Sequence, residues 1–175
     1  MSESLSLQCR HYRNGSNMPN DRTVIVFDDE QSERLPLIKE LLGKDVKLKW
    51  FDYFSSEAID RGETAVFVWP EQLSKHEISL LLIDLAVVRK AEAEDGIRVL
   101  RRLRAAFPNL PAFVISDSDR INDLKIRRQL RALDVSDDHI FFWPELMKGP
   151  GPLQEKFRNE AKRILAKASS EKSNG

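Results

Sequence analysis

The chain has 175 residues, with 28 basic and 28 acidic side chains and a formal net charge of zero. Its length and its hydrophobic fraction of 41% predict one globular domain with a sizeable core and exclude a disordered chain. Zero net charge provides no bulk attraction to nucleic acid or membrane, and the single cysteine, Cys9, excludes an internal disulfide. The sequence has no stretch long enough to span a membrane and no signal-peptide core, so we expect a cytoplasmic protein without nucleic-acid or membrane partners.

The N-terminal part predicts an extension followed by a strand and a helix. Residues 1–21 are polar and carry turn-forming residues, which indicates a flexible N-terminal extension. The domain itself is expected over residues 22–168, followed by a disordered tail at 169–175. Its first strand is expected to begin near Arg22 and to end at the acidic sequence Asp28-Asp29-Glu30.

The first helix is expected to begin near Leu35, because Pro36 is tolerated only in a first turn, and to end at Gly43. Apolar and lysine residues alternate over 46–51, which is typical of an edge strand. The sequence from Ser55 is typical of a helix start, and residues 63–77 are expected to form an insertion before the third strand.

The second half of the chain alternates clearly between strands and helices. We expect strands at 78–84, 112–115 and 139–143, and helices from about 96 to 107, 122 to 133 and 153 to 168. Five strands alternating with helices predict an α/β fold with a doubly wound five-stranded parallel sheet.

Three apolar runs end in polar residues suited to a shared site. Asp28, Asp84 and Ser116 each follow such a run directly. Buried parallel strands deliver the residues that follow them to one edge of the sheet, where α/β proteins bind ligands. Closely packed carboxylates repel one another unless a cation neutralises them, and Mg²⁺ is a natural choice for oxygen ligands. The pattern therefore predicts an acidic pocket with a hydroxyl beside it.

Four segments in this order resemble the receiver domain of two-component response regulators. Val24–Glu30 resembles the family's first strand and acidic pair, and Leu81–Asp84 resembles its third strand and phosphoacceptor. Asp95–Arg104 is similar to the helix that follows, and Leu110–Ser116 is similar to the fourth strand with its terminal hydroxyl. The resemblance implies a sheet order of 2-1-3-4-5 with helices on both faces.

The resemblance also implies roles for individual residues. Asp84 would be the phosphoacceptor, and Ser116 would hydrogen-bond the phosphoryl group. Asp29 and Asp84 would contact Mg²⁺ directly, Asp28 would hold it through water, and the backbone carbonyl of Ala86 would complete the ligands. A histidine kinase or phosphotransfer protein would donate the phosphoryl group, and an output protein that the sequence does not identify would receive the signal.

The sequence departs from the family pattern at several points. Trp143 precedes Pro144 where receivers carry a lysine that pairs with the phosphoryl group, and an indole offers only a neutral donor. Lys148 lies five residues further on, and the family's aromatic switch position falls on Ile140 or, with a one-residue shift, on Phe141. The loop after Asp84 is also longer than usual. A pseudo-receiver that is not phosphorylated and binds proteins constitutively is therefore an alternative.

Other interpretations of the same residues remain open. The acidic residues after the strands could cap the helices that follow, and Ser116 lies in a sequence suited to helix capping. A hydrolase with Asp28 as nucleophile is a further alternative, although neither receiver interpretation requires an enzyme. Residues 98–131 carry six more basic than acidic side chains, which indicates solvated helix faces or, alternatively, a surface for an acidic partner. The basic residues are Arg98, Arg101, Arg102, Arg104, Arg120, Lys125, Arg127, Arg128 and Arg131.

Overall fold

The computed structural model describes residues 22–28, 30–51, 78–85 and 94–173. The predicted N-terminal extension, the predicted helix near Ser55 and the predicted insertion at 63–77 lie outside these residues. Asp29 and Ala86, two of the predicted metal ligands, also lie outside them.

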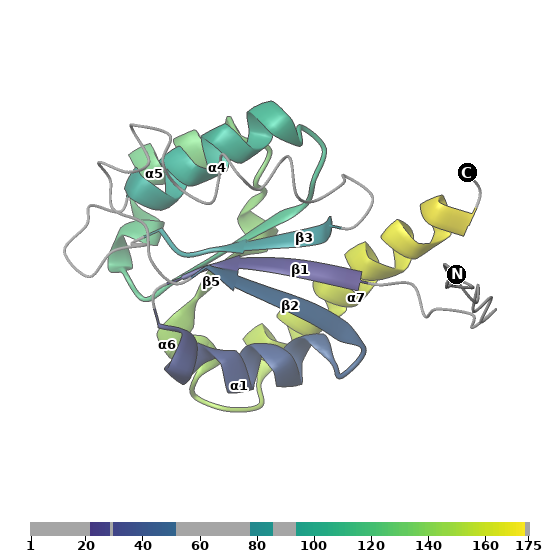
Figure 1. Cartoon of the computed structure of the whole chain (residues 1–175). Coiled ribbons are helices and arrows are strands. Elements are labelled where there is room, and N and C mark those ends of the chain that lie inside the picture. The colour runs from purple at the N-terminus through teal and green to yellow at the C-terminus, as the bar shows by residue number, and fades with distance from the viewer. Residues whose placement is uncertain (1–21, 29, 52–77, 86–93, 174–175) are drawn as a thin grey trace, which may run out of the picture.

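Five parallel strands form a single sheet in the order β2-β1-β3-β4-β5 (Figure 1). This confirms the predicted fold class and the predicted strand order. The carboxyl ends of all five strands therefore lie at one edge of the sheet. The strands are β1 (Arg22–Phe27), β2 (Val46–Phe51), β3 (Ile78–Ile83), β4 (Ala112–Ser116) and β5 (Ile140–Phe142).

Helices cover both faces of the sheet (Figure 1). On one face lie α4 (Glu94–Ala106) and α5 (Leu124–Arg131), and on the other lie α1 (Gln31–Leu42), α6 (Trp143–Leu146) and α7 (Pro152–Ser173). Short 3-10 turns, η1 (Asp119–Asn122) and η2 (Asp137–His139), precede α5 and β5.

Alternate strand residues supply two separate apolar cores. Ile25 and Phe27 pack on the side of α4 and α5, whereas Val24 and Val26 pack on the side of α1 and α7. Both faces of β1 are thus buried, which explains its almost continuous apolar sequence. No helix in the described part of the chain has the length and apolarity needed to cross a membrane.

The prediction for the start of the first helix is wrong. Helix α1 begins at Gln31, so Pro36 lies inside it rather than in its first turn. The backbone N–H of Arg34 donates to the Glu30 carbonyl at 3.0 Å and holds this early turn. The helix tolerates a proline because tertiary contacts, including the fully buried side chains of Arg34 and Ile38, outweigh the lost backbone bond.

Two other predicted boundaries differ from the structure. Strand β5 ends at Phe142, and Trp143 begins α6 instead of ending the strand. Pro144 suits that position, since a proline is well accommodated in the first turn of a helix. Helix α7 continues to Ser173, so the tail predicted to be disordered from residue 169 is helical over most of its length.

Two arginines of the basic region bind backbone carbonyl groups of neighbouring segments. Arg104 donates from Nε to the Leu133 carbonyl at 2.8 Å and from Nη1 to the carbonyls of Pro108 and Leu110. Burial lowers the pKa of Arg104, although Asp134 acts in the opposite direction. Arg127 donates from Nε to the Ile121 carbonyl at 2.6 Å. Part of the local positive charge therefore has a structural role.

Gly96 brings α4 against the end of β3. Its N–H donates to the Leu85 carbonyl at 3.0 Å. A Cβ at this position would lie 2.0 Å from the Asp84 carbonyl oxygen and 2.7 Å from the Leu85 Cα. Because both are backbone atoms, no side-chain movement can make room.

We therefore expect Gly96→Ala to destabilise the protein by about 1–3 kcal/mol in urea unfolding, even though alanine is favoured over glycine in a helix by about 1 kcal/mol. Ala105→Gly, on the exposed side of the same helix, is the control, because it measures the difference in helix propensity between alanine and glycine at a position without a clash. A gain in stability in Gly96→Ala would contradict the close approach.

Candidate functional site

The ends of β1 and β3 place two buried carboxylates side by side. Phe27 and Ile83 are paired in neighbouring strands, and Asp28 and Asp84 follow them directly. The Asp84 N–H donates to the Phe27 carbonyl at 2.9 Å, which fixes the two chain segments together. Each aspartate is only 2% exposed. The strand ends thus bring together these two members of the predicted acidic pocket.

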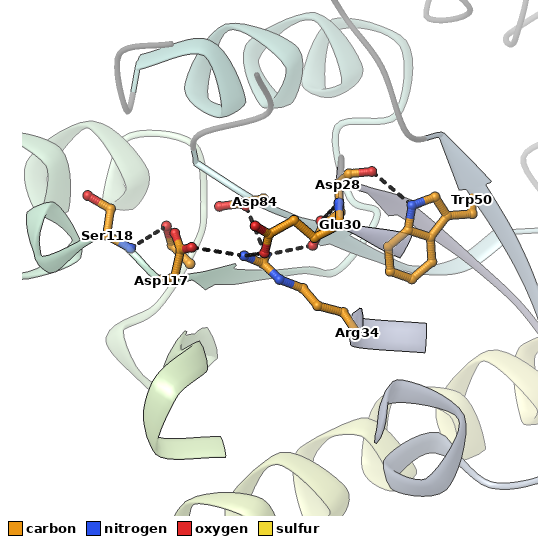
Figure 2. A network of polar contacts seen from close by, with 8 residues as sticks. Asp28, Glu30, Arg34, Trp50, Asp84, Asp117 and Ser118 are labelled. Carbon is orange, nitrogen blue, oxygen red and sulfur yellow. Dashed lines mark hydrogen bonds and ion pairs between the residues drawn. The ribbon is translucent and has the colours of Figure 1, made fainter. Parts of the chain in front are cut away.

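The cation between these carboxylates is the guanidinium of Arg34 (Figure 2). Its Nη1 donates to Asp28 Oδ2 at 2.7 Å and to Asp84 Oδ2 at 2.8 Å. Its Nη2 donates to Glu30 Oε2 at 2.6 Å and lies 3.4 Å from Asp117 Oδ2. Arg34 is fully buried. One side chain therefore links α1 to the ends of β1, β3 and β4.

The local sequence explains why Arg34 points into the site. Glu30 is the N-cap residue of α1, and Arg34 follows four residues later on the same side of the helix. The Glu30 N–H donates to Asp28 Oδ1 at 2.7 Å, which orients that carboxylate. From β2, Trp50 Nε1 donates to the Asp28 carbonyl at 2.8 Å.

The electrostatics of the cluster keep Arg34 charged. Burial by itself lowers the pKa of Arg34, but the carboxylates of Asp84, Asp28 and Glu30 outweigh this effect and raise the pKa above its ordinary value. The guanidinium therefore remains a cation throughout the physiological range. Burying both ions of such a pair carries a large desolvation penalty, so the pair contributes little net free energy to stability. Removing only one partner lowers stability by far more than this net contribution, because the other charge stays buried.

Trp143 lies over the guanidinium. The Arg34 Cζ is 5.2 Å from the centre of the Trp143 ring, and Trp143 is 7% exposed. An aromatic face attracts a cation, and the attraction is strongest where water is excluded. By resemblance, this residue occupies the position of the receiver lysine. The tryptophan that replaces the family's lysine thus lies against Arg34, and Arg34 reaches the acidic residues from α1.

Ser116 lies at the same edge of the sheet, at the end of β4, and is fully buried. Its hydroxyl accepts a hydrogen bond from the Ser118 N–H at 3.2 Å. The Ser118 hydroxyl, in turn, caps η1 by accepting from the Arg120 N–H at 3.3 Å. Ser116 therefore stabilises the turn after β4, and the neighbouring Asp117 reaches Arg34.

The predicted switch residues are core residues. Phe141 is fully buried, with its ring centre 5.1 Å from that of Phe113 and 4.9 Å from that of Phe157. Ile140 is 7% exposed and packs in the opposite core. Lys148 is exposed in the turn after α6.

Mg²⁺ does not fit the described residues while Arg34 holds this position. The ion binds carboxylate oxygens at roughly 2.0–2.1 Å, and here Asp28 Oδ2 and Asp84 Oδ2 share the Nη1 of Arg34 at hydrogen-bonding distance. A metal bridging the same oxygens would collide with and repel this nitrogen. In the described part of the chain, no group of three or more His, Cys, Asp or Glu side chains could hold a metal ion.

Sequence reasoning missed Arg34. The only basic residue that the sequence pattern suggested near the acidic residues was Lys148. The spacing of Glu30 and Arg34 was the available signal, together with the tryptophan at the position of the lysine.

Comparisons with known proteins support the fold. No protein-family model and no curated protein matches the sequence. Among solved structures, a response regulator from Thermotoga maritima is 20% identical, with a TM-score of 0.52, covering 83% of this chain and 98% of its own. A signal receiver domain of a two-component histidine kinase from Clostridium thermocellum is 17% identical, with a TM-score of 0.52, covering 85% of this chain and 98% of its own. The chain therefore has the fold of response-regulator receiver domains, and the predicted resemblance is confirmed at that level.

We expect Arg34→Met to destabilise the protein by about 3–5 kcal/mol, because it removes a buried cation that binds both Asp28 and Asp84. Chemical unfolding measures the loss. Arg158→Met is a matched control, since Arg158 pairs at 2.8 Å with a mostly exposed Glu40 and should cost no more than about 1 kcal/mol. Adding Asp28→Asn and Asp84→Asn to Arg34→Met should recover much of the loss. Equal losses in Arg34→Met and Arg158→Met would contradict the role of Arg34.

Trp143→Lys should be strongly destabilising, because it buries an ammonium beside the Arg34 guanidinium, whereas Trp143→Phe retains an aromatic face and should cost less. In an Arg34→Met background, the lysine should be tolerated better than in the wild type. A double-mutant cycle of unfolding free energies measures this coupling. A coupling energy near zero would show that Trp143 and Arg34 do not interact.

Proposed function

We propose that this protein is a pseudo-receiver, a signalling domain with the receiver fold that acts through protein contacts without being phosphorylated. The observation that carries the proposal is the Arg34 guanidinium, bound to Asp28 and Asp84 at 2.7 and 2.8 Å. Under this proposal the domain is not an enzyme, and its acidic site stabilises one conformation.

The chemistry of phosphoryl transfer explains why this arrangement favours the pseudo-receiver. A carboxylate nucleophile needs a free oxygen and a means of neutralising the incoming phosphoryl charge. Asp84 Oδ2 is bound by Arg34, and among the described residues Mg²⁺ has no place beside that arginine. The indole of Trp143 covers the guanidinium where receivers, by resemblance, present a lysine.

Phosphorylation of Asp84 is the second candidate. In its favour, Asp28, Asp84 and Ser116 all lie at the carboxyl edge of the sheet, as a phosphoacceptor site requires. This function would need Arg34 to leave before Mg²⁺ and the phosphoryl group enter. The donor would then be a histidine kinase or a phosphotransfer protein.

A hydrolase that uses Asp28 as nucleophile has less support. Asp28 Oδ1 accepts the Glu30 N–H, and Asp28 Oδ2 accepts a hydrogen bond from Arg34. Glu30, the potential acid two residues later, is itself bound to the guanidinium.

Intact-mass measurement after incubation with acetyl phosphate and Mg²⁺ tests the proposal. We expect no phosphoryl increment on the wild type, and no change in its thermal midpoint with beryllofluoride and Mg²⁺, because Arg34 occupies the place of the metal. An increment on the wild type that Asp84→Asn abolishes would overturn the proposal and establish the second candidate.

Arg34→Ala supplies the matched control for this experiment. Once the guanidinium is removed, Asp28 and Asp84 can share an added cation, so Mg²⁺ should raise the thermal midpoint of this variant more than that of the wild type. An equal response to Mg²⁺ in both proteins would show that Arg34 does not hold the metal position.

A further inference from the structure

A hollow of about 640 Å³ lies at the amino edge of the sheet, opposite the acidic site. Its walls come from the start of β3, the connection between α4 and β4, the residue before β5 and the second half of α7. Its size is within the range of small-molecule sites. The lining residues are Ile78, Ser79, Phe107, Pro108, Asn109, Leu110, Pro111, His139, Arg163, Ile164, Lys167 and Ala168.

A β-bulge places Ser79 in the wall of this hollow. Ile78 pairs with Thr23 and Leu80 pairs with Val24, so Ser79 is an extra residue without a partner in β1. Bulges redirect side chains and are common beside functional sites. Ser79 is 3% exposed, and within the described residues its Oγ has no hydrogen-bond partner. A buried hydroxyl without a partner costs free energy, which a ligand that accepts or donates a hydrogen bond would recover.

The charge of the lining favours an anion. Arg163 and Lys167 carry positive charge, His139 contributes an imidazole ring, and none of the lining residues is acidic. Glu160, outside the lining, binds Arg163 at 2.7 Å and lies 3.5 Å from the His139 ring. The hydrophobic residues of the lining provide an apolar surface between these groups.

The walls of the hollow are held in place before any ligand arrives. Arg104 donates to the carbonyls of Pro108 and Leu110, which fixes the connection between α4 and β4. The His139 ring packs on Phe113 with their centres 4.9 Å apart. A preorganised cavity avoids the cost of ordering its walls upon binding.

From the bulge, the unpartnered Ser79 hydroxyl and the basic apolar lining, we propose that this hollow binds a small molecule with one carboxylate and an apolar body. The carboxylate would accept hydrogen bonds from Ser79 and the basic side chains, while the apolar body would contact residues such as Phe107 and Ile164. The site is separate from the acidic cluster, and the inference stands whether or not Asp84 is phosphorylated.

Titration of the full chain with octanoate below its micellar concentration tests this inference, with ¹H–¹⁵N spectra reporting on the amides of Ser79, Asn109 and Lys167. We expect saturable shifts at these positions and an affinity at least about tenfold higher than for octylamine, which has the same chain length and the opposite charge. Absence of saturable shifts, or equal affinity for the two compounds, would overturn the proposal.

Three variants separate binding from stability. Ser79→Ala should weaken octanoate binding severalfold without lowering the thermal midpoint, since in the described part of the chain the lost hydroxyl leaves no partner behind. Lys167→Met should also weaken binding, whereas Lys162→Met, on the exposed side of α7 and outside the lining, should not. Unchanged affinity in both Ser79→Ala and Lys167→Met would assign octanoate to another site and refute this one.

Discussion

The ion pairs of Arg34 are the constraint on which the acidic edge of this sheet depends. A parallel sheet places the residues after adjacent strands close together, so Asp28 and Asp84 meet whether or not their charges are compensated. The guanidinium compensates both and, through Glu30 and Asp117, also engages the start of α1 and the turn after β4. The same ion pairs thus hold α1 in position and neutralise the two buried aspartates.

A cation that belongs to the chain differs from an exchangeable metal in its thermodynamics. A bound ion stabilises a protein to an extent that depends on its free concentration. Arg34 is always present at the same effective concentration, so its ion pairs with Asp28 and Asp84 do not depend on the concentration of an ion in solution. The Trp143 ring then covers the cation, and a lysine at this place would add a like charge. The two departures from the receiver pattern are therefore consistent with each other.

Much of the fold could be predicted, because apolar runs and helical spacing are local signals. The strand order followed from the resemblance, and the strands that lead into Asp28 and Asp84 and end at Ser116 are buried almost throughout, as their apolar runs predict. The start of α1 could not be predicted, since propensity places Pro36 in a first turn whereas buried contacts extend the helix before it. Arg34 was missed because its partner Asp84 lies 50 residues away, and only the folded chain brings them together.

The same separation has a consequence for the order of folding. The turn from Glu30 to Arg34 can form locally, but Arg34 gains its second buried carboxylate only when β3 has docked beside β1. Loop closure over such distances is slow compared with the formation of a helical turn. Until β3 arrives, water must solvate the guanidinium, so the interior beneath α1 should dehydrate late. Completion of the acidic cluster would then mark one of the last steps toward the native state.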